Sequence, residues 1–202
     1  MSIKNEIHIS DNNGAPFSIF EELYIKAKNV NQNTLDAMAV STSFNNEVSS
    51  RFVNLKYMVS NELIFFTNYN SPKFKHIQSN PNVSCLIYWE KIKTQIRVSG
   101  TATASNEVLS DKHFNERDHS KNIAAISSNQ SQKIDSYEDV LAKYNENMKN
   151  LSGINIKRPS NWGGVSINPS YFEFWFGFDT RLNKRESYTY ENNTWLKSIL
   201  EP

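Results

Sequence analysis

The sequence predicts an α+β fold dominated by an antiparallel β-barrel with flanking helices. From Ala37 onward, apolar residues recur with a period of two, which is typical of half-buried strands, and short polar turns separate the runs. Helical patterns interrupt these strands at only a few places, and neither an internal repeat nor a linker is recognisable. We therefore expect a single domain.

The N-terminal part is expected to be an arm followed by a helix. Residues 1–15 are polar and rich in asparagine, so we predict a flexible arm ahead of one domain over residues 16–202. Ser18 and Glu21 have the spacing of a capping box, which predicts a helix start. The apolar residues that follow at helical spacing are Phe20, Leu23, Tyr24 and Ala27.

Strands are predicted where alternating runs are bounded by turn residues. The first set lies near residues 37–43, 51–59, 62–68, 82–89 and 94–104. The second set comprises Gly164–Ile167, Tyr171–Phe176, Ser187–Tyr190 and Thr194–Leu200. A hairpin turn is expected at Asn192 and Asn193, because asparagine tolerates positive φ.

Three further helices are predicted. Ser71 before Pro72 indicates an N-cap with proline at the first helical position, and Asn80-Pro81 ends that helix. The other two are expected over residues 105–117 and 136–149.

Composition excludes several classes of protein. The chain has 202 residues and a formal net charge of +1, which gives no general electrostatic case for binding nucleic acid or an anionic membrane. Cys85 is the single cysteine, lies among apolar residues and is expected in the core. No stretch approaches the roughly 18 apolar residues of a spanning helix, and the first residues lack a signal-peptide core. The four histidines lack metal-ligand spacing. These features favour a cytoplasmic protein without a metal site.

Two basic segments are candidate anion sites. Arg51 and Lys56 lie on one predicted strand, and regular alternation would point them to opposite faces. To hold one ligand they need a bulge, or a ligand that approaches a strand end; otherwise they are two solvated charges.

Lys73 lies in the first turn of a predicted helix, where a cation opposes the helix dipole unless an anion is bound. A capped surface helix is the alternative.

Later segments add polar and aromatic candidates. His113 and Arg117 share a helical face, and they either hold an anion or line the surface. An aromatic strand around Trp175 leads to Arg181 and Arg185, which offers an apolar wall beside anion-binding groups. A strand covered by a subunit interface would have the same pattern.

Taken together and in order, these segments resemble one known family. AMAV, RFVNLK, FFTN with SPK, QIRVSGTA, Gln130-Ser131, NWGG, EFW and RLNKR are similar to the signature blocks of pyridoxamine 5'-phosphate oxidase, from about Ala37 to the C-terminus. The resemblance implies an FMN-binding split β-barrel that forms a homodimer with flavins at the subunit interface.

The resemblance also assigns residues. Those matching the family's flavin contacts are Arg51, Phe52, Val53, Asn54, Leu55, Lys56, Phe66, Thr67, Lys73, Gln95, Gln130, Ser131, Trp175 and Arg185. Those matching its substrate contacts are Lys56, His113, Arg117, Lys121, Arg181 and Asn183, and Arg181 is the residue expected to act in catalysis by holding the substrate ring.

Some of these positions depart from the family pattern. The family has tyrosine, serine and histidine where this chain has His113, Lys121 and Asn183, and it has a flavin-phosphate arginine where this chain has Pro72. These departures bear on the identity of the substrate.

The resemblance implies an oxidase that converts pyridoxamine or pyridoxine 5'-phosphate to pyridoxal 5'-phosphate with O2 as acceptor. One alternative is an FMN-dependent oxidase of another planar substrate, such as a phenazine-biosynthesis intermediate, which the altered positions favour. Another is a flavin-binding module without turnover, and the weakest is a barrel without a cofactor.

Overall fold

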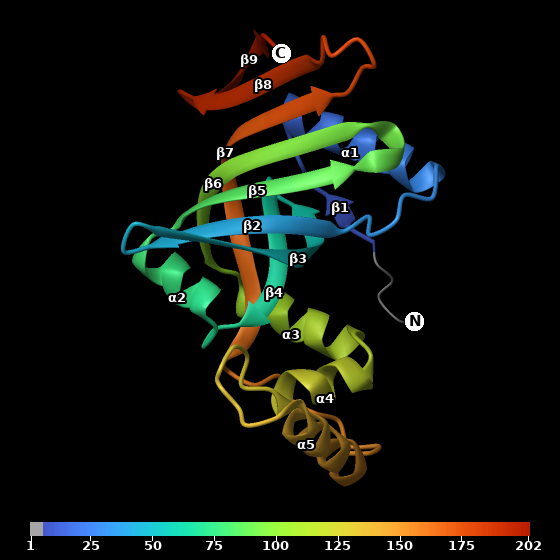
Figure 1. Ribbon diagram of the computed structural model, residues 1–202, viewed down its shortest axis with the longest axis vertical. Coiled ribbons are helices and arrows are strands. Elements are labelled where there is room, and N and C mark those ends of the chain that lie inside the picture. The colour runs from blue at the N-terminus through green and yellow to red at the C-terminus, as the bar shows by residue number, and fades with distance from the viewer. Residues whose placement is uncertain (1–5) are drawn as a thin grey trace.

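The computed structural model describes residues 6–202 as a six-stranded antiparallel barrel flanked by helices (Figure 1). The barrel closes in the order β3-β2-β5-β6-β7-β4 and back to β3. Its strands are β2 (Ala37–Phe44), β3 (Glu47–Val59), β4 (Glu62–Asn68), β5 (Asn82–Trp89), β6 (Thr94–Ala104) and β7 (Trp162–Phe176). The α+β barrel with flanking helices that the sequence predicts is confirmed.

Strand β7 connects the barrel to a two-stranded extension, because its two halves pair with different strands on one side. Its first half pairs with β4, and its second half pairs with β8 (Lys184–Glu191), which continues to β9 (Thr194–Leu200). The sequence predicts two strands here, but the structure has one. Pro169 does not end it, because the β6–β7 register shifts at Gly100 and accommodates the residues around that proline.

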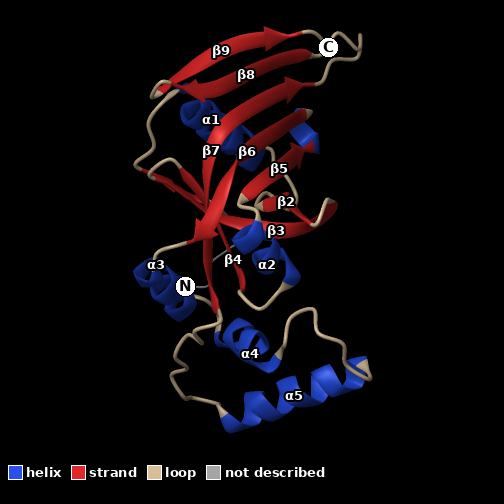
Figure 2. Cartoon of the chain, turned by 90° about the vertical axis from the view of Figure 1, so that its left-hand side faces the viewer, coloured by secondary structure: helices blue, strands red, loops and turns tan. Residues whose placement is uncertain are grey.

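The helices cover the barrel and extend one end of it. They are α1 (Ala15–Asn29), α2 (Pro72–Ser79), α3 (Glu107–Glu116), α4 (His119–Ser127) and α5 (Tyr137–Asn150), with a short 3₁₀ turn at Glu90–Ile92. Figure 2 shows α4 and α5 beyond one end of the barrel, while β8 and β9 lie at the opposite end. Helix α4 is absent from the sequence prediction, and it buries only Asn122 and Ile123.

The predicted core face of α1 is confirmed, but its predicted start is wrong. Phe20, Leu23, Tyr24 and Ala27 are buried, and the rings of Phe20 and Tyr24 lie beside Trp89. The helix begins at Ala15 after Gly14, and the Ser18 hydroxyl donates back to the Ala15 carbonyl instead of capping.

The N-terminal segment differs from the predicted flexible arm. His8–Ser10 forms β1, which pairs in parallel with the end of β3. Ile7 is buried, and its amide donates to the Tyr24 hydroxyl at 2.9 Å. A short strand can add to the free edge of β3 there because its backbone groups would otherwise lack partners. Residues 1–5 of the predicted arm lie outside the described residues.

The core fills the barrel with aliphatic and aromatic side chains, among them Phe65, Phe172, Phe174 and Trp89. Cys85 is buried in it, as predicted, and burial raises the pKa of its thiol to about 12. Among residues 6–202, no helix has the length and apolar character needed to cross a membrane.

Candidate functional site

A pocket of about 370 Å³ opens where β3 and β4 face helices α2, α3 and α4. All but one of its lining residues are site residues that the sequence predicts, and Trp162 is the exception. The lining comprises Phe52, Val53, Asn54, Lys56, Phe66, Thr67, Lys73, His113, Arg117, Lys121, Gln130 and Trp162. The fold thus brings together segments that are far apart in the sequence.

Lys73 lies at the first turn of α2, where its amine meets only neutral oxygens. Its Nζ donates to Thr67 Oγ1 at 3.0 Å, to Ser71 Oγ at 3.2 Å and to Gln130 Oε1 at 3.2 Å. Pro72 occupies the first helical position and lacks an amide proton. The amides of Phe74 and Lys75 donate to the Ser71 carbonyl, so the positive end of this helix lies beside a buried cation.

Arg51 adds a second cation beside Lys73. Burial, followed by the charge of Arg51, lowers the pKa of Lys73 to about 8, and burial lowers the pKa of Arg51. Arg51 donates to the Val40 carbonyl and to Thr42 Oγ1. Among residues 6–202, neither cation has a carboxylate within ion-pair distance. Two partly buried cations at a helix N-terminus without an acidic partner fit a phosphate group.

The bulge that would bring Arg51 and Lys56 to one ligand is present. Leu55 pairs with Phe65 and Tyr57 with Ile64, so Lys56 is the extra residue on β3. The predicted strict alternation along β3 is therefore wrong at this point, and Tyr57 and Met58 are both buried. Lys56 turns towards the pocket, where it forms an ion pair with the buried carboxylate of Asp36.

The opposite wall of the pocket is a group of stacked rings. His113 lies parallel to Phe66 with ring centroids 3.8 Å apart, and Phe66 stacks on Trp162 at 5.3 Å. The guanidinium of Arg117 covers the Trp162 ring at 4.6 Å. A planar cation on an aromatic face keeps an apolar wall next to hydrogen-bond donors, which suits a planar anionic ligand.

Arg117 is held in place by one nitrogen, while another is buried without a partner among the described residues. Its Nη2 donates to the Lys121 carbonyl at 3.1 Å, while its Nη1 is buried without a partner among the described residues. Burial lowers the pKa of Arg117. An unpaired buried donor is costly, so an anionic ligand would satisfy it.

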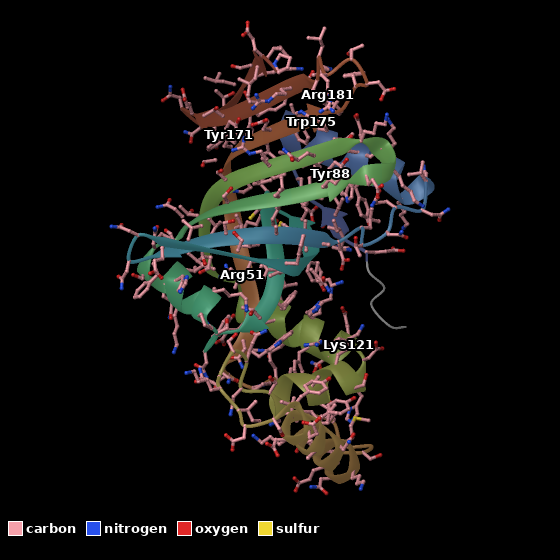
Figure 3. All side chains as sticks on the ribbon, in the orientation of Figure 1. Arg51, Tyr88, Lys121, Tyr171, Trp175 and Arg181 are labelled. Atoms are coloured by element: carbon pink, nitrogen blue, oxygen red, sulfur yellow. The ribbon has the colours of Figure 1, made fainter. Side chains whose placement is uncertain are left out.

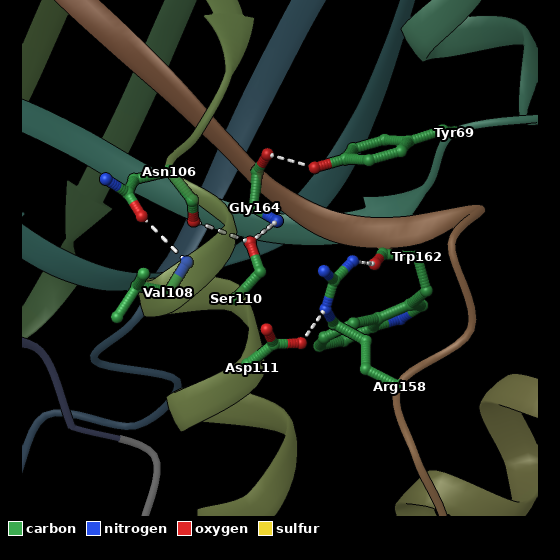
Figure 4. A network of polar contacts seen from close by, with 8 residues as sticks. All are labelled: Tyr69, Asn106, Val108, Ser110, Asp111, Arg158, Trp162 and Gly164. Atoms are coloured by element: carbon green, nitrogen blue, oxygen red, sulfur yellow. Dashed lines mark hydrogen bonds and ion pairs between the residues drawn. The ribbon is translucent and has the colours of Figure 1, made fainter.

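Figure 4 shows the network that fixes α3 against β7 and so positions these rings. The Gly164 amide donates to Ser110 Oγ at 3.0 Å, and the Gly164 carbonyl accepts from the Tyr69 hydroxyl at 2.9 Å. Arg158 bridges the two elements, since it donates to Asp111 and to the Trp162 carbonyl. The NWGG segment therefore places Trp162 in the pocket wall.

Three predicted flavin contacts in this region differ in their exposure. Leu55 is wholly buried in the core, and its amide donates to the Asp36 carbonyl, so it does not line the pocket. Phe52 is 77% exposed. Ser131 has a φ of 68° and lines a neighbouring small cavity rather than the pocket.

The remaining predicted residues form a second cluster away from the pocket. Gln95 pairs with Trp175, and Trp175 pairs with Arg185 across β6, β7 and β8. Figure 3 shows Trp175 and Arg181 at the β8–β9 end of the molecule, while Arg51 and Lys121 lie nearer the helical end. Arg181 is exposed in the loop before β8, where Asn183 accepts a hydrogen bond from the Phe178 amide. One chain thus carries two separate halves of the predicted site.

Arg185 differs from Lys73 because it already has an acidic partner. Its Nε and Nη2 reach Glu173 Oε1 at 2.9 and 2.8 Å, and the other oxygen of Glu173 binds Arg97. Glu173 is buried between the two arginines. The carboxylate orients both side chains on the outer face of the barrel.

Sequence reasoning missed one residue that lines the pocket and two residues that bond to its lining. Asp36 pairs with Lys56, Tyr57 bonds His113, and Trp162 forms part of the wall. The NWGG segment was a signal for Trp162. No pattern in the sequence indicates Asp36 or Tyr57, because their partners Lys56 and His113 lie 20 and 56 positions away along the chain.

Comparison with family models matches most of the chain. Residues 30–146 match a model described as pyridoxamine 5'-phosphate oxidase. Residues 162–202 match a model described as the pyridoxine 5'-phosphate oxidase C-terminal dimerisation region.

Individual relatives extend over nearly the full length. The pyridoxine/pyridoxamine 5'-phosphate oxidase of Leptospira biflexa is 36% identical over 188 residues, which are 93% of this chain and 89% of the relative. That of Rippkaea orientalis is 37% identical over 194 residues, 95% of this chain and 92% of the relative.

Solved structures agree on the fold. PhzG from Burkholderia lata 383, in complex with tetrahydrophenazine-1-carboxylic acid, superposes with a TM-score of 0.89 at 25% identity and covers 95% of both chains. An FMN-binding protein from Nostoc punctiforme, related to pyridoxamine 5'-phosphate oxidase, gives a TM-score of 0.75 at 15% identity, and covers 93% of this chain and 98% of its own.

Proposed function

The chain belongs to the pyridoxamine 5'-phosphate oxidase family, and we propose that it oxidises pyridoxamine or pyridoxine 5'-phosphate to pyridoxal 5'-phosphate with O2 as acceptor. It is an oxidoreductase of the FMN-dependent type found in this family. The substrate, the bound FMN and the dimer are the parts that we propose. The cytoplasmic location expected from the sequence stays a prediction.

The observation that carries the proposal is the uncompensated charge of Lys73 and Arg51. The Lys73 amine has three neutral partners, and Arg51 lies near enough to lower its pKa. An FMN phosphate would supply the missing negative charge at the start of α2. When bound, FMN would supply the redox chemistry of the oxidation, with O2 as the final electron acceptor and hydrogen peroxide as its reduced product.

The chain's own residues would hold and orient the substrate. Arg117, with a free Nη1 and a guanidinium resting on Trp162, is placed to bind the substrate phosphate. Lys121 brings a further cation to the same wall, and the stacked rings of Phe66 and His113 exclude water from one side. Holding the phosphate fixes the distance of C4' from the reacting atom of the cofactor, which is where most of the protein's contribution lies.

We propose that the second half of each site comes from the partner subunit of a homodimer. Trp175 and Arg181 lie away from the pocket in one chain (Figure 3), and Arg185 is the strand neighbour of Trp175. All three fall within the region that matches the dimerisation model. A two-fold dimer repeats every contact, so each pocket would receive this cluster from its partner. Arg181 would then cover the substrate ring, with Asn183 beside it.

A different planar substrate is the second candidate. The likeness to PhzG, whose structure contains tetrahydrophenazine-1-carboxylic acid, favours it. His113, Lys121 and Asn183 also favour it, because they depart from the family pattern on the substrate side. A pocket lined by Lys56, Arg117 and Lys121 would accept a carboxylate as well as a phosphate.

Oxygen uptake by the FMN-loaded protein distinguishes the two. Pyridoxamine 5'-phosphate and pyridoxine 5'-phosphate are compared with their dephosphorylated forms and with phosphate-free aromatic carboxylic acids. Uptake with the two phosphorylated vitamers alone, matched by hydrogen peroxide release, supports the vitamin oxidase. Oxygen uptake with the carboxylic acids alone would contradict the vitamin oxidase and support an oxidase of another planar substrate.

A further inference from the structure

Tyr57 and His113 form a buried polar pair, and His113 lines the pocket. The Tyr57 hydroxyl lies 3.1 Å from His113 Nδ1, and the two rings meet edge to face. Tyr57 is 8% exposed and His113 is 5% exposed. Stacking on Phe66 fixes the plane of the imidazole, so its two nitrogens have fixed directions.

The direction of this hydrogen bond follows from the donors available. The Tyr57 hydroxyl has no other hydrogen-bond partner among residues 6–202, so its proton requires Nδ1 as the acceptor. Burial, followed by the charge of Glu116, raises the pKa of Tyr57, which keeps the hydroxyl protonated. If Nδ1 accepts, a neutral imidazole carries its proton on Nε2, the nitrogen that points away from Tyr57.

The surroundings of His113 oppose a positive charge on the ring. Lys56 from β3, Arg117 at the end of α3 and Lys121 from α4 all line the same pocket. Burial, followed by these three cations, lowers the pKa of His113 to about 3. One face of the ring is covered by Phe66, and Trp162 lies nearly parallel farther away, so these neighbours add no charge.

We propose that Tyr57 is a positioning residue that holds His113 as the neutral Nε2–H tautomer, so that the pocket presents a directional, uncharged donor to the anionic group of its ligand. This deepens the proposed function and rests on it for the identity of that ligand. The cations of the pocket attract the anion without choosing its orientation, whereas a single N–H with a fixed direction selects one position for an oxygen.

The tautomer is directly measurable in the FMN-loaded protein by ¹⁵N NMR of its histidine rings. His113→Gln identifies the His113 signals. We expect a protonated Nε2 and an unprotonated Nδ1, unchanged from pH 8 down to pH 5. Protonation of Nδ1, or a cationic ring above pH 6, would overturn the inference whatever the substrate proves to be.

The role of Tyr57 is tested by Tyr57→Phe, which removes only the hydroxyl. Both tautomers should then appear, and pyridoxal 5'-phosphate should bind about five- to tenfold more weakly. Tyr24→Phe is the matched control, because it also removes a buried tyrosine hydroxyl but lies against the N-terminal strand. A single Nε2–H tautomer and unchanged affinity in Tyr57→Phe would contradict the positioning role.

These readouts separate the two proposals. If the wild-type protein does not bind pyridoxal 5'-phosphate, the proposed substrate is wrong, and the NMR spectrum still decides the tautomer.

Discussion

Lys73 illustrates how a single residue carries information about a ligand. Its amine is buried, donates to three neutral oxygens and lies near a second cation. A buried charge without a carboxylate is unfavourable in the ligand-free protein, and an anion removes that penalty. The same environment makes the charge of Lys73 sensitive to pH.

We predict that FMN affinity falls as the pH rises above about 8. The pKa of Lys73 is lowered to about 8 by burial and then by Arg51. Bound phosphate favours the charged amine and raises this pKa, so binding takes up a proton at alkaline pH. Between pH 8 and 9.5 the dissociation constant should rise by up to roughly tenfold per unit, which flavin fluorescence quenching of the apoprotein measures.

Two controls isolate the phosphate. Riboflavin, which lacks it, should bind with no such decline. Lys73→Met should weaken FMN binding by about thirtyfold, roughly 2 kcal/mol, and remove the pH dependence. An FMN affinity that stays constant from pH 7 to 9.5 would contradict the assignment of Lys73.

At the scale of single residues, the sequence predicts the lining of the pocket well, because the lining residues lie in segments that resemble the signature blocks of the family. It does not predict the partners of those residues. Asp36 and Tyr57 act through contacts with Lys56 and His113, and only the barrel and the α3–β7 network bring these residues together. The bulge at Lys56 is likewise invisible in an alternating strand pattern.

At the scale of elements, the site depends on irregularities in otherwise regular strands. The bulge at Lys56 turns that side chain into the pocket, and the shift at Gly100 lets β7 run past Pro169 to reach both the barrel and β8. A Cβ on Gly100 would lie 2.1 Å from the Asn168 carbonyl oxygen. This approach is between two backbones, so no side-chain rotation relieves it.

Gly100→Ala should therefore destabilise the protein by about 1–3 kcal/mol, because β6 and β7 would have to separate. Urea unfolding followed by tryptophan fluorescence measures the change. Thr101→Ala, at an exposed position of the same strand, is the control and should cost far less. Equal stabilities of the two variants would show that the close approach does not constrain this strand pair.

Elements bounded by clear turn residues are predicted accurately. β4, β5, β6 and β9 begin and end at the predicted residues, and the turn at Asn192 and Asn193 has positive φ at both positions. Helix α4 was missed because it is short and buries only two residues, so it leaves almost no apolar period. The start of α1 was misplaced because Gly14, not a side-chain cap, precedes it.

At the scale of the whole molecule, the predicted site residues fall into two separate groups on one chain. The pocket lies beside the helices, whereas Trp175 and Arg181 lie towards the other end (Figure 3), and Arg185 pairs with Trp175 there. Periodicity predicts which segments are strands, but it contains no information about contacts between subunits. Only the resemblance to the family predicted that the two groups of residues belong to one site at a subunit interface.

Subunit complementation tests this arrangement. Lys73→Met damages the pocket half and Arg181→Ala the other half, so each homodimer should have little oxidase activity at an FMN concentration between the dissociation constants of the wild type and of Lys73→Met. Random mixing by co-refolding gives dimers in which one site receives both intact halves, and about one quarter of wild-type activity should return. If Arg181 acts within its own chain, mixing would restore nothing.

The most direct test of the proposed function is an anaerobic titration of the FMN-loaded protein with pyridoxamine 5'-phosphate, followed by flavin absorbance. We predict that the absorbance bleaches in proportion to added substrate and recovers when air is admitted, with release of pyridoxal 5'-phosphate. A flavin that stays oxidised with both phosphorylated vitamers would contradict the proposed reaction, while the fold and family assignment would stand.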